Sequence, residues 1–341
     1  MPQPSFAPEG CAGAALSRRQ CLSRLAVLLG AAYECPGLAQ NSSDYPARAI
    51  RIIIPNTVGG TSDLLARLIG ARLSDAVGQP VFVESRPGAA GRIALDYTAK
   101  AAPDGYTLFL GNNGTNAIVQ GTQGGEIVDD SALVPVIKLA SLAIVIAATP
   151  RLDVKSLDDT IERARRAPGS LAYASSGIGS TSHMAAALLS QRAGIKMLQI
   201  PYAGTASAVK DVLAGEVQLI FTHLATVATL IRAGQLRALA VTGPRRAAAF
   251  PEIPTVAESG FPDFDVETWH GVLVPPGTPR EIVMRLHAEL SRMLKLKDLR
   301  AQLGAMGMEP LGGTPEEFAA DILADRKRWA AVIRDSGVPT Q

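Results

Sequence analysis

The stretch PNTVGGTSDLLARLIG, residues 55–70, places a turn with two glycines between an apolar run and a helical repeat. The preceding residues 50–54, IRIII, predict a buried strand, and apolar residues recur every fourth position over 65–73, as on one face of a helix. A helix that begins at such a turn leaves backbone N–H groups free at the positive end of its dipole. The stretch therefore predicts a strand–turn–helix unit whose turn either binds an anion or is simply a tight connection.

The same alternation of strands and helices continues along the chain. Further strands are expected at residues 81–84, 106–110, 171–174, 197–200, 217–221 and 236–241, with helical segments between them. A β-α-β-α-β order indicates parallel sheets with right-handed crossovers. Because the order occurs twice, the sequence predicts two α/β units.

Two helix starts near the C-terminus carry a Thr-Pro-x-Glu pattern. Thr278 and Thr314 each stand at an expected cap, followed by Pro and then by Glu at the third helical position. We therefore expect Glu281 and Glu317 to cap helices and not to act as catalytic acids. The adjacent carboxylates of Asp158–Asp159 are expected to be solvated surface charge.

The composition of the 341-residue chain argues against nucleic-acid binding, because the formal net charge is only +2 and 5% of residues are aromatic.

The first 39 residues differ from the rest. Arginines at 18, 19 and 24, an apolar run over 25–32 and small residues at 37–39 predict a signal peptide, of the twin-arginine or the general type. All three cysteines precede residue 40, so we expect an exported chain without disulfides. Nor should it span a membrane, since no later apolar run reaches ~18 residues.

No motif predicts catalysis. The G-x-S-x-G turn of serine hydrolases is missing, and the four histidines are scattered without metal-binding spacing. A dinucleotide fold is the strongest enzyme alternative, but Gly59-Gly60 lacks the G-x-G-x-x-G fingerprint and Asp63 would repel a phosphate. We therefore expect no cofactor, no metal and no enzymatic activity; an exported enzyme stays open as a further alternative, which would show turnover.

Small, neutral loops rich in glycine and hydroxyl groups follow four of the predicted strands. They are NTVGGTS at 56–62, GNNGTN at 111–116, SSGIGSTS at 175–182 and PYAGTAS at 201–207. In α/β sheets, ligands bind at the carboxyl ends of the strands, and two such edges that face each other form a cleft. Because these loops contain neither Lys nor Arg, they favour a small anion held by hydrogen bonds and helix ends. The ligand inferred is a carboxylate.

In their order and number, several segments resemble the substrate-binding receptors of tripartite tricarboxylate transporters, also called the Bug family. They include YPARAIRIIIP, GGTSDLLAR, VFVESRPGAAGRIA, LAYASSGIGSTSH and PEIPTVAESGFPDF, within a likeness that extends over residues 45–339. The resemblance implies an α/β fold of the type II periplasmic binding proteins, in which two α/β domains close over a ligand in the cleft between them.

The resemblance also implies domain boundaries. After a signal peptide at 1–39, the first domain would comprise residues 40–142 and 268–341, and the second domain residues 143–267. Two crossing strands would join the domains.

Ligand contacts are likewise implied, residue by residue. They are Asn56, Thr57, Val58, Gly59, Gly60, Asp63, Asn113, Thr115, Ser175, Ser176, Gly177, Ser180, Thr181, Tyr202, Gly204 and Thr222. The first loop would hold one carboxylate through backbone groups and bridging waters. His183 is expected to be an internal hydrogen-bond partner and not a ligand contact.

Three of these positions depart from the family pattern. Asn56 and Val58 replace a Phe and a Pro of the first loop, and Thr222 stands where an Asp is frequent. We hypothesise that losing this Asp disfavours amino-acid ligands, since their ammonium group needs an acidic partner.

These observations predict a monomeric periplasmic receptor for a small organic acid, of the di- or tricarboxylate class. It would deliver the acid to the membrane subunits of a transporter. A ligand-sensing subunit that signals to a membrane sensor kinase is the alternative, and both functions would use the same cleft.

Overall fold

The computed structural model describes residues 45–118, 133–202 and 205–336, within a compact unit of residues Tyr45–Gln341. The predicted signal peptide, the three cysteines and Gly204 lie outside the described residues. Within the described ranges, no helix combines the length and the hydropathy needed to cross a bilayer.

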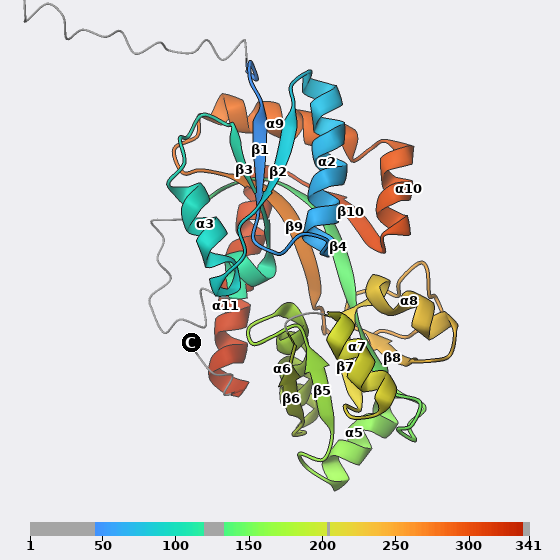
Figure 1. The fold of residues 1–341 in the computed structure, drawn as a ribbon. Helices are drawn as coiled ribbons and strands as arrows, with labels where there is room; N and C mark the ends of the chain where they lie inside the picture. The colour runs from blue at the N-terminus through green and yellow to red at the C-terminus, as the bar shows by residue number, and fades with distance from the viewer. Residues whose placement is uncertain (1–44, 119–132, 203–204, 337–341) are drawn as a thin grey trace, which may run out of the picture. The chain divides into compact units, whose positions relative to one another are not determined.

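The first α/β domain is built on a sheet in the order β2-β1-β3-β9-β4 (Figure 1). Strands β1, β2 and β3 run parallel, whereas β9 is antiparallel to β3, and β10 pairs with β4. The strands are β1 (Ile50–Ile54), β2 (Val81–Ser85), β3 (Thr107–Asn112), β4 (Val134–Ala148), β9 (Glu267–Val274) and β10 (Met308–Gly312). The helices are α2 (Thr61–Val77), α3 (Arg92–Ala99), α9 (Arg280–Met293), α10 (Lys297–Ala305) and α11 (Pro315–Ser336), with the short turns η2 (Ala89–Gly91) and η3 (Gly114–Ile118).

The second α/β domain contains the sheet order β4-β7-β5-β6, with β8 on the other side of β4. Strands β5, β6 and β7 are parallel, as their sequence pattern predicts, while β7 and β8 run antiparallel to β4. The elements are α5 (Leu157–Arg166), β5 (Ala172–Ser175), α6 (Thr181–Ala193), β6 (Leu198–Pro201), α7 (Thr205–Ala214), β7 (Leu219–His223), α8 (Leu224–Arg232) and β8 (Arg237–Val241).

Strand β4 belongs to both sheets. Its first part pairs with β9 as far as Ala143, and from Ile144 onward it pairs with β7 and β8. The loops that follow the parallel strands of both domains lie near this junction. The exact boundaries predicted for the two domains stay a prediction.

Successive side chains of a strand point to opposite faces of its sheet. Each sheet therefore has an apolar cluster on both faces, and helices cover both clusters. In the first domain, Ile52 packs in the cluster that contains side chains of α2 and α9, and Ile53 in the cluster that contains side chains of α3 and α11. In the second domain, Phe221 packs in the cluster of α5 and α6, and Ile220 in that of α7 and α8. The isoleucines before the glycine turn therefore fill two cores at once.

Helix α11 contributes to the cores of both domains. Phe318, near its start, packs against Trp269 in the first domain, with ring centroids 5.1 Å apart, whereas Trp329 is buried in a cluster with α5 and α6 of the second. Between them, the indole of Trp269 donates a hydrogen bond of 2.7 Å to Asp325.

The helix-start predictions have mixed outcomes. The box at Thr314 is confirmed, since Thr314 N–H donates to the Glu317 carboxylate at 2.8 Å and Glu317 N–H donates to Thr314 Oγ1 at 3.1 Å. The box at Thr278 is wrong: its hydroxyl donates to the carbonyl of Pro275, and α9 begins one residue later, after Pro279.

The prediction that Asp158–Asp159 is merely solvated charge is also wrong for Asp159. Its carboxylate and the side chain of Ser156 form a capping box at the start of α5.

We predict that Trp329→Ala lowers the free energy of unfolding by about 3–5 kcal/mol, because the indole is fully buried. Urea unfolding measures this, with Leu323→Ala on the same helix as the control. Leu323 is 48% exposed, so its truncation should change stability by less than about 0.5 kcal/mol. Equal losses in the two variants would contradict the assignment of Trp329 to a core.

Candidate ligand-binding site

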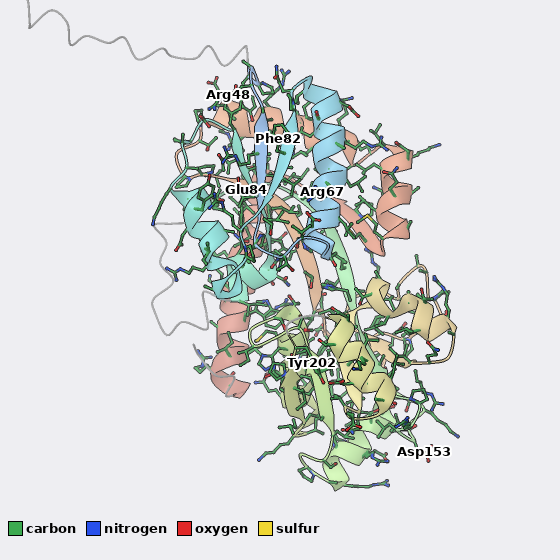
Figure 2. The ribbon with its side chains drawn as sticks, in the orientation of Figure 1. Arg48, Arg67, Phe82, Glu84, Asp153 and Tyr202 are labelled. Carbon is green, nitrogen blue, oxygen red and sulfur yellow. The ribbon has the colours of Figure 1, made fainter. Side chains whose placement is uncertain are left out.

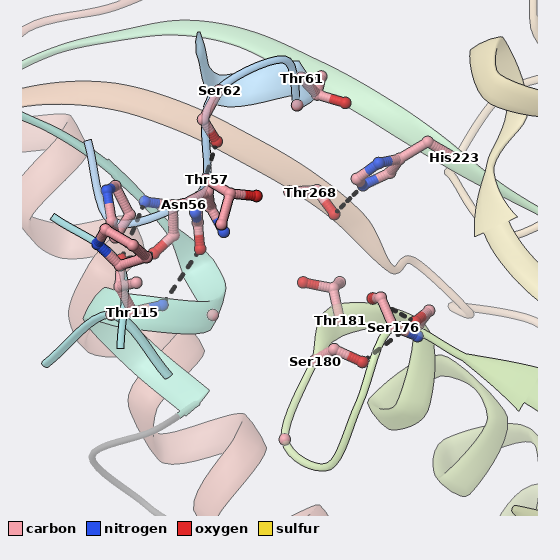
Figure 3. A pocket seen from close by; sticks show the side chains of 18 of the residues that line it. Asn56, Thr57, Thr61, Ser62, Thr115, Ser176, Ser180, Thr181, His223 and Thr268 are labelled. Atoms are coloured by element: carbon pink, nitrogen blue, oxygen red, sulfur yellow. Dashed lines mark hydrogen bonds between the residues drawn. The ribbon is translucent and has the colours of Figure 1, made fainter. Parts of the chain in front are cut away.

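A cavity of about 470 Å³ lies where the two domains meet (Figure 3). Most of its wall comes from loops at the carboxyl ends of β1, β2, β3, β5 and β7, with β9 at the back. Its lining residues are Pro55, Asn56, Thr57, Gly60, Thr61, Ser62, Pro87, Gly88, Gly91, Asn112, Gly114, Thr115, Ser176, Ile178, Gly179, Ser180, Thr181, Ser182, Thr205, Thr222, His223 and Thr268. The volume is in the range of pockets for small molecules.

Eight residues predicted from the sequence line this cavity: Asn56, Thr57, Gly60, Thr115, Ser176, Ser180, Thr181 and Thr222. Seven others lie outside its lining: Val58, Gly59, Asp63, Asn113, Ser175, Gly177 and Tyr202. The structure therefore brings all the predicted loops to one place but turns several of their side chains elsewhere.

The first loop is held from within by Asp63. This buried carboxylate accepts a hydrogen bond of 3.0 Å from Gly59 N–H and forms an ion pair of 3.0 Å with Arg67, one helical turn later. The hydrogen bond from Arg67 is the main reason that the pKa of Asp63 lies below its usual value. Asp63 thus shapes the turn, while Val58 is 66% exposed beside it.

The start of α2 presents free donors to the cavity. Its N-cap residue, Gly60, has no side chain to cap the helix, so the first-turn N–H groups at Thr61 and Ser62 stay available at the positive end of the helix dipole. This is the arrangement that a carboxylate or another small anion requires.

The opposite wall is the loop before α6. Ser180 caps this helix by accepting from His183 N–H at 3.2 Å, and its hydroxyl donates to the carbonyl of Gly177 at 2.7 Å. His183 accepts in turn from Gly179 N–H through Nδ1, at 3.1 Å. The prediction that His183 is an internal hydrogen-bond partner is therefore confirmed. Burial lowers its pKa to about 4, so the ring is neutral at pH 7.

A hydrogen-bond chain joins the domains behind the cavity. Thr181 Oγ1, from α6, donates to Asn113 Oδ1 at 3.0 Å, and Asn113 Nδ2 donates to the carbonyl of Glu267 on β9 at 2.7 Å. Asn113 is fully buried. It therefore links Thr181 of the second domain to β9 of the first and is not part of the cavity lining.

Two more predicted residues support the wall from outside. Tyr202, labelled in Figure 2, donates a hydrogen bond of 2.7 Å through its hydroxyl to Asp211 on α7. Burial, and then the contact with Asp211, raise the pKa of Tyr202 to about 12. Ser175 is buried and accepts a hydrogen bond of 2.9 Å from Gln199 on the neighbouring strand.

Some lining residues lie outside the four loops that the sequence predicts, and they include one further loop and one strand. Pro87, Gly88 and Gly91 follow β2 as the predicted loops follow their strands, so the same rule would have found them. Thr268 lies on β9, which is antiparallel to β3. No local pattern signals that this strand passes the cavity.

The cavity wall is polar but uncharged. Among its lining residues there is no Lys, Arg, Asp or Glu, and within the described part of the chain no group of His, Cys, Asp and Glu is placed to hold a metal ion. Hydroxyls and helix N-termini are therefore the main polar groups of the wall, and groups of this kind bind anions by hydrogen bonds.

We predict that Gly91→Ala destabilises the protein more than Gly169→Ala. Both glycines have a positive φ, of 94° and 79°, so both alanines incur a similar backbone strain of about 1–2 kcal/mol. At Gly91 the added Cβ would also collide with Thr115 and lie 3.0 Å from Pro55, whereas Gly169 has open space. Thermal unfolding measures the difference; equal decreases in Tm would show that the wall tolerates the methyl group.

Comparison with known proteins identifies the family. Residues 65–338 match the family model TctC, described as the tripartite tricarboxylate transporter family receptor. Protein BugT of Bordetella pertussis is 35% identical over 322 residues, which cover 93% of this chain and 98% of BugT.

Solved structures of similar sequence share the fold. The structure of R. palustris Rpa4515 with adipate has a TM-score of 0.78 and 35% identity, and the alignment covers 86% of this chain and 99% of that one. MatC from Rhodopseudomonas palustris with bound malate has a TM-score of 0.74 and 29% identity, with 85% and 100% covered. The chain belongs to the family of tripartite tricarboxylate transporter receptors, which includes the Bug proteins.

Proposed function

We propose that this protein is a periplasmic receptor that binds a small dicarboxylate or tricarboxylate and passes it, chemically unchanged, to the membrane subunits of a tripartite tricarboxylate-type transporter. The observation that carries the proposal is the uncharged cavity between the starts of α2 and α6. Two helix N-termini from different domains suit a ligand with a carboxylate at each end.

The ligands in the two similar structures support this class. Adipate and malate are both dicarboxylates. A cavity of about 470 Å³ has room for acids of this size, with space for the bridging waters that complete such sites.

We assign direct ligand contact to the predicted residues that line the cavity, above all Thr57 and Thr115 in the first domain and Ser176, Thr181 and Thr222 in the second. Asp63, Asn113 and Tyr202 would act indirectly, by fixing the loops. The two domains would close over the acid by bending β4 and β9 near residues 142–143 and 267–268, which are the predicted boundaries.

A thermal-shift screen of the chain from Gln40 onward tests the proposal, with succinate, malate, glutarate, adipate and citrate as candidates. At one hundred times its dissociation constant, a ligand stabilises the native state by about 2.7 kcal/mol, which raises Tm by several degrees. We expect at least one of these acids to do so. Acetate and butylamine are the controls, and no shift with any di- or tricarboxylate would contradict the proposal.

We further predict that glutarate binds more tightly than glutamate. The two share a carbon skeleton, but the ammonium group of glutamate would be buried in a cavity that has no acidic lining residue to pair with it. Calorimetry should show a difference of at least about tenfold, which corresponds to 1.4 kcal/mol. Equal or tighter glutamate binding would contradict the hypothesis that Thr222 disfavours amino acids.

Co-purification from membranes tests the partner. Recovery of a transporter membrane subunit with the loaded receptor would support delivery, whereas recovery of a sensor kinase would favour the signalling alternative.

A further inference from the structure

His223 combines properties that no other lining residue has. It is the last residue of β7 and the N-cap of α8, and its ring points from the second domain into the cavity (Figure 3). Its Nε2 lies 3.0 Å from Thr268 Oγ1 on β9, so one edge of the ring is held in place. It is the one titratable residue among those that line the cavity.

The second ring nitrogen of His223 is open. Within the described residues no hydrogen bond reaches its Nδ1, and this atom is not among the polar atoms sealed from solvent. His270, the nearby histidine on β9, differs: its Nε2 is 3.0 Å from Ser62 Oγ, and its Nδ1 is sealed without a partner. His270 therefore completes the packing, whereas His223 keeps a free hydrogen-bonding atom in a ligand cavity.

The charges around His223 are few. Burial lowers the pKa of His223 to about 4. Burial and the neighbouring His223 together lower the pKa of His270 further, to about 3. Glu267 on β9 is half-buried, and desolvation is the main cause of its raised pKa. The other groups that act on this pKa are Ser141, Asp265, Glu309 and Arg245, and His223 is not among them. Without an anionic neighbour, the imidazole of the empty receptor is neutral at pH 7.

We propose that His223 is a further ligand contact, that its Nδ1 hydrogen-bonds a carboxylate of the bound acid, and that binding in mildly acidic solution takes up a proton at this ring. The inference rests on the proposed function, because it needs a carboxylate in the cavity. Nothing in the sequence pattern marks His223, since it is one of four scattered histidines.

The direction of the proton movement follows from electrostatics. A carboxylate beside the imidazole favours the imidazolium form and raises its pKa in the complex. Between the pKa of the empty receptor and the higher pKa of the complex, binding therefore takes up protons, and well above both values it takes up none. A ligand that is itself partly protonated and binds as an anion releases protons. The two effects have opposite signs.

Isothermal titration calorimetry in buffers of different ionisation enthalpy measures this proton count, with the acid that gives the largest shift among succinate, malate, glutarate and adipate. Because release from the ligand is the same in every variant, the difference between wild type and His223→Leu isolates the proton taken up at the ring. We expect wild type to take up a fraction of a proton more than His223→Leu or His223→Asn near about pH 5.5, and the difference to vanish near about pH 8. His223→Leu should also weaken binding at neutral pH by about tenfold, since a buried carboxylate loses its donor.

His223→Asn separates contact from structure. Asparagine is a favoured N-cap, and its side-chain amide can replace the Nδ1 donor, so binding at neutral pH should stay within about threefold of wild type. His287→Gln is the control, because His287 lies on α9, where its Nε2 contacts the carbonyl of Gly313; its proton uptake should equal that of wild type. Circular dichroism verifies that each variant folds.

Two results would overturn the inference. Normal affinity and normal proton uptake in His223→Leu would remove His223 from the contacts and leave the proposed function standing. Failure of the wild-type protein to bind any of the acids would overturn the proposed function and this inference together.

Discussion

The continuous strand β4 is the constraint on which the rest of the structure depends. Its 15 residues hydrogen-bond to β9 and β10 in one domain and to β7 and β8 in the other. Backbone pairing fixes the register of both sheets against this one strand, and the parallel strands of each domain end near the junction. The loops after those strands therefore meet across a single cavity, and the chemistry of the cavity is the chemistry of those loops.

The groups that line the cavity need no countercharge. Hydroxyl side chains and the first-turn N–H groups of α2 take the place of Lys and Arg among the lining residues. A fixed cation would bind any small anion strongly, whereas directional donors bind an acid tightly only when its length and shape match their positions. Selectivity would then come from geometry.

Several polar side chains lie behind the cavity wall and support it. Asp63 is paired with Arg67 inside the first loop, and His183 is buried within the loop before α6. Asn113 ties Thr181 to β9 from behind. Since each of these groups is satisfied by protein partners, the loops are held in position before a ligand arrives, and less ordering is required on binding.

The sequence by itself determined the local elements and the kind of site. The run IRIII, the glycine turn after it and the helical repeat that follows predict the first strand–turn–helix unit because periodicity and turn chemistry act within a few residues. The same rule located the four loops and their hydroxyl-rich, uncharged character, and the resemblance implied two α/β domains. Local patterns also misled, as at Thr278, where the hydroxyl is used by Pro275 and not by the helix.

Only the tertiary structure decided which side chains of those loops face the cavity. Val58, Asp63, Asn113 and Tyr202 belong to the predicted loops but lie outside its lining, because the backbone turns and the ion pair of Asp63 direct them elsewhere. Thr268 and His223 enter the wall because the start of β9 and the end of β7 both lie beside β4 where it passes from one sheet to the other. Contacts between residues so distant in the chain depend on strand pairing and crossing, which leave no periodic signal in the sequence.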